Sequence, residues 1–222
     1  MIKRVAIICG IILSASIIIS LGIMCFKNIS PDEFKPAAFI FVLDTSKSNQ
    51  QNLDKQKNFI KQFCSLLDPE DKVKIIKASE DSYLIYEGAP HDGKIISNSL
   101  DKFSVGKNET NYAAYGAAIK KAVFYSLVMK KQNYTPVVLV LGNLENKGKN
   151  TNRVNWKTLP KNIETTSKYI PDFTMVFAFA NPDKLDYVKG KLTPVLGEKH
   201  LIISTEEMSN KISQKLFKAI GR

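Results

Sequence analysis

Cysteine and histidine are both scarce in this chain, with three cysteines and two histidines among 222 residues. Cys9 and Cys25 fall within an uncharged N-terminal stretch, so Cys64 is the lone cysteine of the remaining sequence. A disulfide within that part is therefore excluded, and a chain of this length can bury enough apolar surface to fold without one. Cys64 lies in an amphipathic helical stretch, residues 59–67, which indicates a small core residue.

Charged residues are absent from positions 5–26, a stretch of 22 residues dominated by Ile, Val, Leu, Ala and Gly. A helix needs roughly 20 apolar residues to cross a bilayer, so we expect a single transmembrane helix here. Lys3 and Arg4 precede it. The positive-inside rule then predicts a cytoplasmic N-terminus, residues 1–4, with the chain after residue 26 on the periplasmic or extracellular side.

Two other interpretations of this N-terminal stretch stay open. A cleaved signal peptide has a shorter apolar region, about 7–15 residues, and a small-x-small cleavage site, which residues 22–26 match poorly. A lipoprotein would use Cys25, but Met24 stands where a small residue is expected. If the helix is not cleaved, residues 27–36, with their two prolines, form a stalk in front of a domain spanning residues 37–222.

Acidic residues are outnumbered, since 32 Lys and Arg face 21 Asp and Glu and leave a net charge of +11. A basic domain outside the cytoplasm is able to contact anionic lipid headgroups or an acidic partner. The lysines are dispersed along the sequence, however, and dispersed lysines also fit ordinary solvated surfaces. No nucleic-acid-binding motif accompanies the charge, so no nucleic-acid partner is expected.

Strand and helix patterns alternate along the rest of the chain. Apolar runs predict strands at 38–44, 72–78, 83–87, 136–141, 173–180 and 200–204. Helical spacing predicts helices at 49–67, 93–103, 112–131, 157–169, 182–191 and 206–220. Strands that are apolar on both faces are typical of a parallel sheet covered on both sides. We therefore predict an α/β fold with a doubly wound, mostly parallel six-stranded sheet, helices on both faces, and the reversal of strand order beside the first strand.

The first predicted strand ends in the sequence Asp44-Thr45-Ser46-Lys47-Ser48. Ligands of open α/β sheets bind at the carboxyl ends of strands. One carboxylate and two hydroxyls at such a point form an all-oxygen set, which suits a hard divalent cation such as Mg²⁺. The same residue types also serve as helix N-caps, so capping alone is a second explanation of the pattern.

Two further loops extend the pattern, because Thr110 precedes the Ala-rich helix and Gly142-Asn143-Leu144 follows the strand at 136–141. This order and spacing resembles the von Willebrand factor A domain, the family that includes integrin I domains, over about residues 36–220. The resemblance implies a metal-ion-dependent adhesion site for Mg²⁺ or Mn²⁺. The ligand positions that it implies fall on Asp44, Ser46, Ser48, Thr110 and Asn143.

Position 143 departs from the family pattern, which usually has Asp there within a Thr-Asp-Gly-type turn. An amide in place of a carboxylate removes one negative charge, so the affinity for a cation is expected to fall. Glu145 is close in sequence and is a candidate accessory ligand. A weakened cation site and a degenerate site that binds no cation both stay open.

A protein-interaction module, and not an enzyme, is the function that the resemblance implies, with a bound cation accepting an acidic side chain of a protein partner. The alternative is a metal-independent structural subunit of a membrane or envelope complex. A metal-assisted phosphohydrolase is disfavoured, because Ser46 stands where haloacid-dehalogenase-like enzymes carry a second carboxylate. A serine hydrolase is disfavoured because neither serine lies in a Gly-x-Ser-x-Gly elbow.

Overall fold

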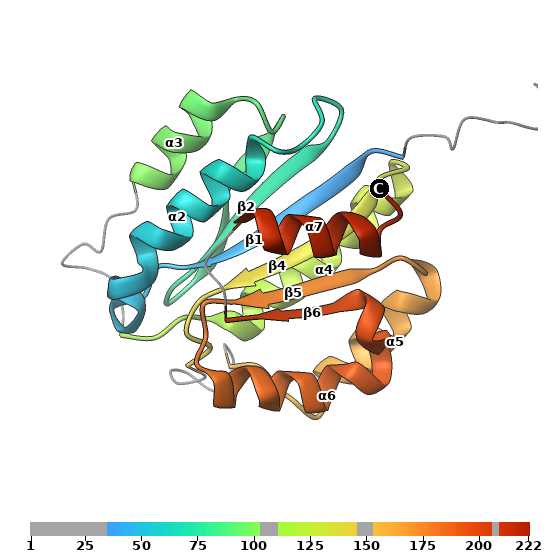
Figure 1. Cartoon of the computed structure of the whole chain (residues 1–222). Helices are drawn as coiled ribbons and strands as arrows, with labels where there is room; N and C mark the ends of the chain where they lie inside the picture. The colour runs from blue at the N-terminus through green and yellow to red at the C-terminus, as the bar shows by residue number, and fades with distance from the viewer. Residues whose placement is uncertain (1–34, 103–110, 146–152, 206–208) are drawn as a thin grey trace, which may run out of the picture. The chain divides into compact units, whose positions relative to one another are not determined.

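A six-stranded sheet in the order β3-β2-β1-β4-β5-β6 forms the centre of the fold (Figure 1). The computed structural model describes residues 35–102, 111–145, 153–205 and 209–222. The strands are β1 (Ala37–Asp44), β2 (Lys72–Ala78), β3 (Ser82–Gly88), β4 (Thr135–Leu141), β5 (Thr174–Ala178) and β6 (Leu201–Ser204). All neighbours pair in parallel except β3, which runs antiparallel to β2 at one edge. The predicted doubly wound, mostly parallel sheet is confirmed, with its reversal of order beside β1.

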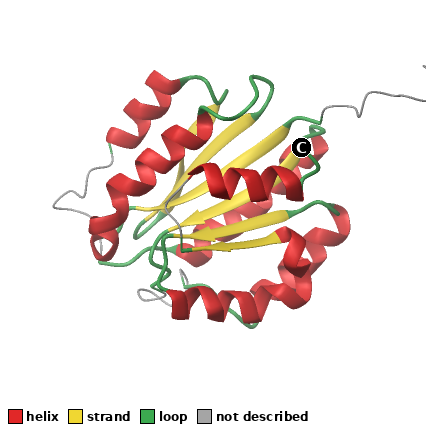
Figure 2. Cartoon of the chain, viewed as in Figure 1, coloured by secondary structure: helices red, strands yellow, loops and turns green. Residues whose placement is uncertain are grey.

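Helices cover both faces of this sheet, as the alternating pattern predicted (Figure 2). One face carries α2 (Gln50–Cys64), α3 (Gly93–Asp101) and α7 (Ser209–Ala219). The other carries α4 (Tyr115–Lys131), α5 (Leu159–Tyr169) and α6 (Pro182–His200). A short 3₁₀ turn, η1 (Lys47–Asn49), leads from β1 into α2.

The two cores lie on opposite sides of β1, because successive side chains of a strand point to opposite faces. Phe39 and Phe41 pack into the core under α2, while Ile40 and Val42 pack into the core under α4, all without solvent exposure. Phe63 of α2 meets Phe39 and Phe41 edge to face, at ring-centroid distances of 5.4 and 5.7 Å. Each such side chain contributes about 1.5–3 kcal/mol by burial, so β1 is held firmly where its polar end emerges.

Helix α6 is longer than the sequence pattern predicted, since it continues from residue 191 to His200. Leu192 and Leu196 extend its buried stripe through Pro194, and Gly197 then bends the chain at a φ of 70°. The prediction was wrong here because the apolar contact with the sheet outweighs the helix-breaking tendency of Pro194, whereas Gly197 does interrupt the helical backbone.

The predicted membrane helix, residues 5–26, and the predicted stalk up to residue 34 lie outside the described residues. Among the helices that the structure does describe, none combines the length and the apolar composition needed to cross a bilayer. Residues 36–222 form a compact unit of their own, and both cores belong to it. This unit can therefore be produced and studied without the N-terminal segment.

Candidate functional site

Polar loops from separate parts of the chain meet at the carboxyl ends of β1 and β4. These strands pair up to Leu43 and Leu141, so the residues that follow them emerge side by side. The Ser46 and Ser48 hydroxyl oxygens lie 3.0 Å apart, and Asn143 donates from its amide nitrogen to the Ser48 hydroxyl at 3.1 Å. The structure thus brings together four residues predicted from the sequence, including Asp44 at the end of β1. Thr110, the fifth, lies outside the described residues.

Asp44 is fully buried beneath this face. One carboxylate oxygen accepts a hydrogen bond from the Ser46 backbone N–H at 2.9 Å, and the other accepts one from the Tyr115 hydroxyl at 2.5 Å. Burial raises the pKa of Asp44 to about 6, although the hydrogen bonds from Tyr115 and Ser46 act in the opposite direction. The carboxylate therefore depends on these two donors for its stability inside the fold.

Tyr115 at the start of α4 is a member of the site that the sequence did not reveal. Its hydroxyl donates to Asp44 and accepts from the Leu144 backbone N–H at 3.2 Å, and its side chain is only 1% exposed. Burial, followed by the neighbouring Asp44, raises its pKa well above the usual value. The only signal in the sequence is a bulky polar residue at the head of the small-residue run from Gly116 to Ala118.

Gly142 explains how the loop after β4 comes this close to Asp44 and Tyr115. A Cβ atom at this position would lie 2.0 Å from the Tyr115 hydroxyl oxygen and 2.5 Å from the Asp44 Cβ. The residue also has a φ of 155°, which side-chain-bearing residues rarely adopt. The loop after β4 can therefore close over Tyr115 only because glycine occupies position 142.

Asn143 directs its amide nitrogen, and not its oxygen, toward the serine hydroxyls. Its side-chain oxygen accepts a hydrogen bond from the Glu145 backbone N–H at 2.8 Å, which fixes the orientation of the amide. The Nδ2 atom is then left to donate to Ser48. Glu145 makes this contact through its backbone N–H. The bond therefore does not position the Glu145 carboxylate as an accessory ligand.

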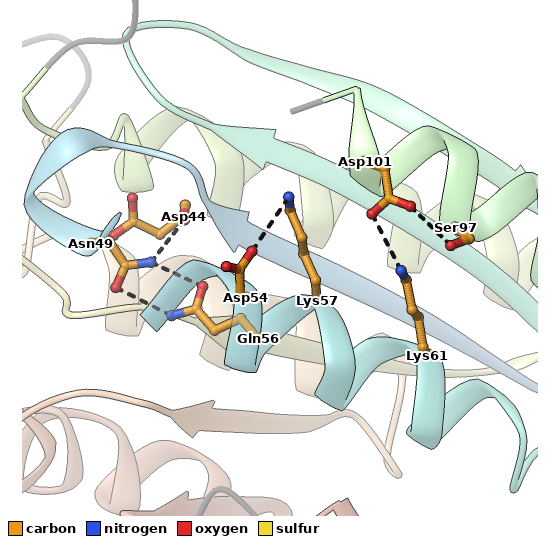
Figure 3. Close-up of polar contacts among 8 residues, drawn as sticks. All are labelled: Asp44, Asn49, Asp54, Gln56, Lys57, Lys61, Ser97 and Asp101. Carbon is orange, nitrogen blue, oxygen red and sulfur yellow. Dashed lines mark hydrogen bonds and ion pairs between the residues drawn. The ribbon is translucent and has the colours of Figure 1, made fainter. Parts of the chain in front are cut away.

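A buried pair of side-chain amides supports the site from below (Figure 3). Asn49 donates to the Asp44 carbonyl oxygen at 2.8 Å and to Gln56 Oε1 at 2.9 Å, and Gln56 Nε2 donates back to Asn49 Oδ1 at 3.2 Å. Both side chains are almost without solvent exposure. Because buried amides are costly unless paired, this contact fixes the path from β1 through η1 into α2.

As arranged here, the described residues of the predicted set, which do not include Thr110, do not fit a divalent cation. The site holds one buried carboxylate, whose two oxygens both accept hydrogen bonds, and Asn143 presents a donor where a cation needs an oxygen. Among the described residues, the buried side-chain oxygen that lacks a hydrogen-bond partner belongs to Thr45, which is not one of the predicted ligands. The described residues also contain no group of three His, Cys, Asp or Glu able to hold a metal ion. The metal-ligand role of the predicted set remains a prediction.

The Ser46 and Ser48 hydroxyls lie at the opposite end of the sheet from His200. This histidine precedes β6, and its Nδ1 lies 3.0 Å from the Thr174 hydroxyl at the start of β5. Because β1, β5 and β6 belong to one parallel set, the starts of β5 and β6 are at the opposite end of the sheet from Asp44. Ser46 therefore has the Ser48 hydroxyl beside it, and not the His200 imidazole that could act as a base.

Comparison with known proteins agrees with the fold. The family model of the von Willebrand factor type A domain matches residues 39–144. No curated protein shows a significant match to the sequence.

Several solved structures share the architecture. BatB from Bacteroides thetaiotaomicron is 15% identical, with a TM-score of 0.59 over 84% of this chain and all of that chain. An aerotolerance-related membrane protein from Bacteroides fragilis is 15% identical, with a TM-score of 0.57 over 83% of this chain and 98% of that one. Proximal thread matrix protein 1 from the mussel byssus, solved with a zinc-occupied adhesion motif, is 15% identical, with a TM-score of 0.52 over 83% of this chain and 45% of that one.

At these identities the structural neighbours show the fold alone. The matched segment, residues 39–144, includes the loops that carry Asp44 and Asn143. The family match over this segment and the shared fold both agree with the resemblance that the sequence motifs indicated.

Proposed function

We propose that residues 36–222 act as a protein-interaction module, held outside the cytoplasm by the N-terminal segment 5–26. Domains of this family typically mediate contacts between proteins, and one of the structural neighbours is described as a membrane protein. The proposed contact surface, called here the loop face, consists of the residues around the carboxyl ends of β1 and β4: Lys47, Ser48, Asn111 and Asn143.

The observation that carries this proposal is the polar, hydrogen-bonded construction of the loop face. Ser48 donates from its backbone N–H to the Asn111 carbonyl at 3.3 Å and receives the Asn143 amide on its hydroxyl. Lys47, Ser48 and Asn111 are exposed, whereas Asp44 beneath them is buried. A surface that is ordered before a partner arrives loses little conformational entropy on binding.

An acidic side chain is the partner group that suits this surface. Lys47 supplies a positive charge, and the Ser48 hydroxyl and Asn143 amide supply hydrogen-bond donors beside it. The excess of basic residues over the whole chain adds a favourable long-range field. We propose that a carboxylate of the partner binds these donors directly, and the cation-bridged contact is the competing version.

The alternative role, a structural subunit whose apolar segment docks within a membrane complex, uses a different part of the chain. Contacts of that subunit would centre on residues 5–26, so changes on the loop face would leave its assembly intact. Binding through the loop face instead depends on Lys47.

Site-directed photocrosslinking separates these roles. A photoreactive amino acid replaces Asn111 on the loop face or, as a control, the exposed Lys161 on α5 in the full chain within its native membrane. We expect a protein adduct from position 111 only, with equal yield in Mg²⁺ and in chelator, and loss of that adduct when Lys47→Glu is introduced.

The outcomes discriminate between the versions. An adduct that forms only in Mg²⁺ supports the cation-bridged contact. Equal adducts from both positions, or co-purification of a membrane complex that Lys47→Glu leaves unchanged, favours the structural subunit.

A further inference from the structure

We infer that the Tyr115 hydroxyl takes over at Asp44 the role that a cation has in an adhesion site, so that the loop face is assembled by a phenol and needs no metal. This inference goes beyond the proposed function. It concerns the same face but does not depend on whether a partner binds there.

The first part of the argument is the contact with Asp44. A buried carboxylate needs compensation, either from a positive charge or from hydrogen-bond donors. Tyr115 provides that compensation at 2.5 Å, on the oxygen that the Ser46 backbone leaves available. The residue reaches Asp44 across 71 positions of sequence, so this bond links α4 to the end of β1.

The second part is the link to the loop after β4. The Tyr115 hydroxyl also accepts from the Leu144 N–H at 3.2 Å, which leaves it bonded to two separate loops. Gly142 passes so close to this oxygen that even a methyl group would overlap it. One buried hydroxyl therefore joins the three chain segments that a bridging cation would otherwise have to join.

The third part is the orientation of Asn143. With Tyr115 satisfying Asp44, a second carboxylate beside the serines would be an uncompensated charge at the rim. The amide at position 143 avoids that charge and donates to Ser48 instead. Tyr115 and Asn143 thus both depart from a set of oxygen ligands around a cation. Tyr115 does so beneath the loop face, and Asn143 does so at its edge.

The experiment measures Mn²⁺ binding to residues 36–222 by calorimetry and by loss of the free-ion electron paramagnetic resonance signal. The variants are wild type, Tyr115→Phe, Tyr115→Phe with Asn143→Asp, and that pair with Asp44→Ala. The matched control combines Asn143→Asp with Tyr125→Phe, because Tyr125 lies on the same helix and its ring contacts the Lys74 ammonium instead of Asp44. Circular dichroism confirms that each variant is folded.

We expect no Mn²⁺ binding by the wild type at millimolar ion. The Tyr115→Phe, Asn143→Asp pair should bind with a dissociation constant at least tenfold below the highest Mn²⁺ concentration at which the wild type shows no binding. That gain should vanish with Asp44→Ala and be absent in the Tyr125 control. Binding by the wild type that Asp44→Ala removes overturns the inference. So does failure of the folded pair to bind, or an equal gain in the Tyr125 control, because Tyr115 would then not be what replaces the ion.

A second readout requires no metal. The Leu144 amide loses its acceptor in Tyr115→Phe, so its hydrogen exchange should accelerate by at least tenfold, while the Asn49 side chain stays bonded to Asp44 and Gln56. Unchanged exchange at Leu144 would show that the hydroxyl does not hold the loops together, and the inference would then fail even if the proposed partner contact were found.

Discussion

At the scale of single residues, the candidate site depends on one position without a side chain. Gly142 lets the loop after β4 pass over Tyr115 and Asp44 in a backbone conformation that suits glycine. The neighbouring groups are a buried phenol and a buried carboxylate, which have no room to move aside. Substitutions here test whether the observed closure is the stable state of the site.

Gly142→Ala is expected to destabilise the fold by about 2–4 kcal/mol, from overpacking together with backbone strain. Urea unfolding of residues 36–222 measures the loss. The control is Gly93→Ala at the start of α3, where a Cβ atom would meet nothing within 4 Å. Equal stability of the Gly142 variant and the wild type would mean that the loop closure seen here is not maintained in solution.

A second prediction at this scale concerns His200. Burial lowers the pKa of His200 below 6.5, with Lys199 acting in the same direction. Because the folded state favours the neutral ring, the stability that this residue contributes is complete above the unfolded pKa of 6.5 and is lost as the pH falls through the lower folded value.

We expect His200→Gln, which keeps a hydrogen-bonding group beside Thr174, to reduce the loss of stability between pH 7.5 and pH 5. Urea midpoints at the two pH values for both proteins provide the comparison. An identical loss in the wild type and the variant would show that His200 is not responsible for any of the acid sensitivity.

At the scale of elements, the end of α7 is attached to the start of β1 by a buried ion pair. Asp71 is fully buried and accepts hydrogen bonds from the Ala37 backbone N–H at 2.7 Å and from Arg222 at 3.0 and 3.1 Å. Arg222 also pairs with the half-exposed Asp68. This contact holds the helix that covers the edge of one core.

Arg222→Met should destabilise the fold by about 2–4 kcal/mol, because it leaves the buried Asp71 carboxylate with too few donors. Lys218→Met, at an exposed position in the last turn of α7, is the matched control and should change stability by less than about 0.5 kcal/mol. Thermal and urea unfolding would report both. A similar effect of the two substitutions would argue that the ion pair has no special role.

At the scale of the whole molecule, the proposed membrane anchor leads to a prediction about the side of the membrane on which residues 36–222 would lie. The sequence predicts the outer side, because Lys3 and Arg4 precede the apolar segment. In cells whose inner membrane is intact, protease added from outside should therefore digest the domain, while a cytoplasmic marker stays protected. Protection of the domain until the membrane is lysed would contradict the predicted orientation.

The sequence alone determined the doubly wound, mostly parallel sheet with its reversal beside the first strand and the two-sided helix cover. These features follow from local patterns, since buried strands and helices carry their own periodicity. The meeting of Asp44, Ser46, Ser48 and Asn143 was implied by the family resemblance of the sequence. The tertiary structure decided the rest: the Tyr115 hydroxyl on Asp44, the Asn49–Gln56 pair, the inward-facing amide of Asn143 and the full length of α6. The strands are encoded by neighbours in sequence, whereas the chemistry of the site is set by side chains that meet across as many as 95 residues, where no local pattern records the contact.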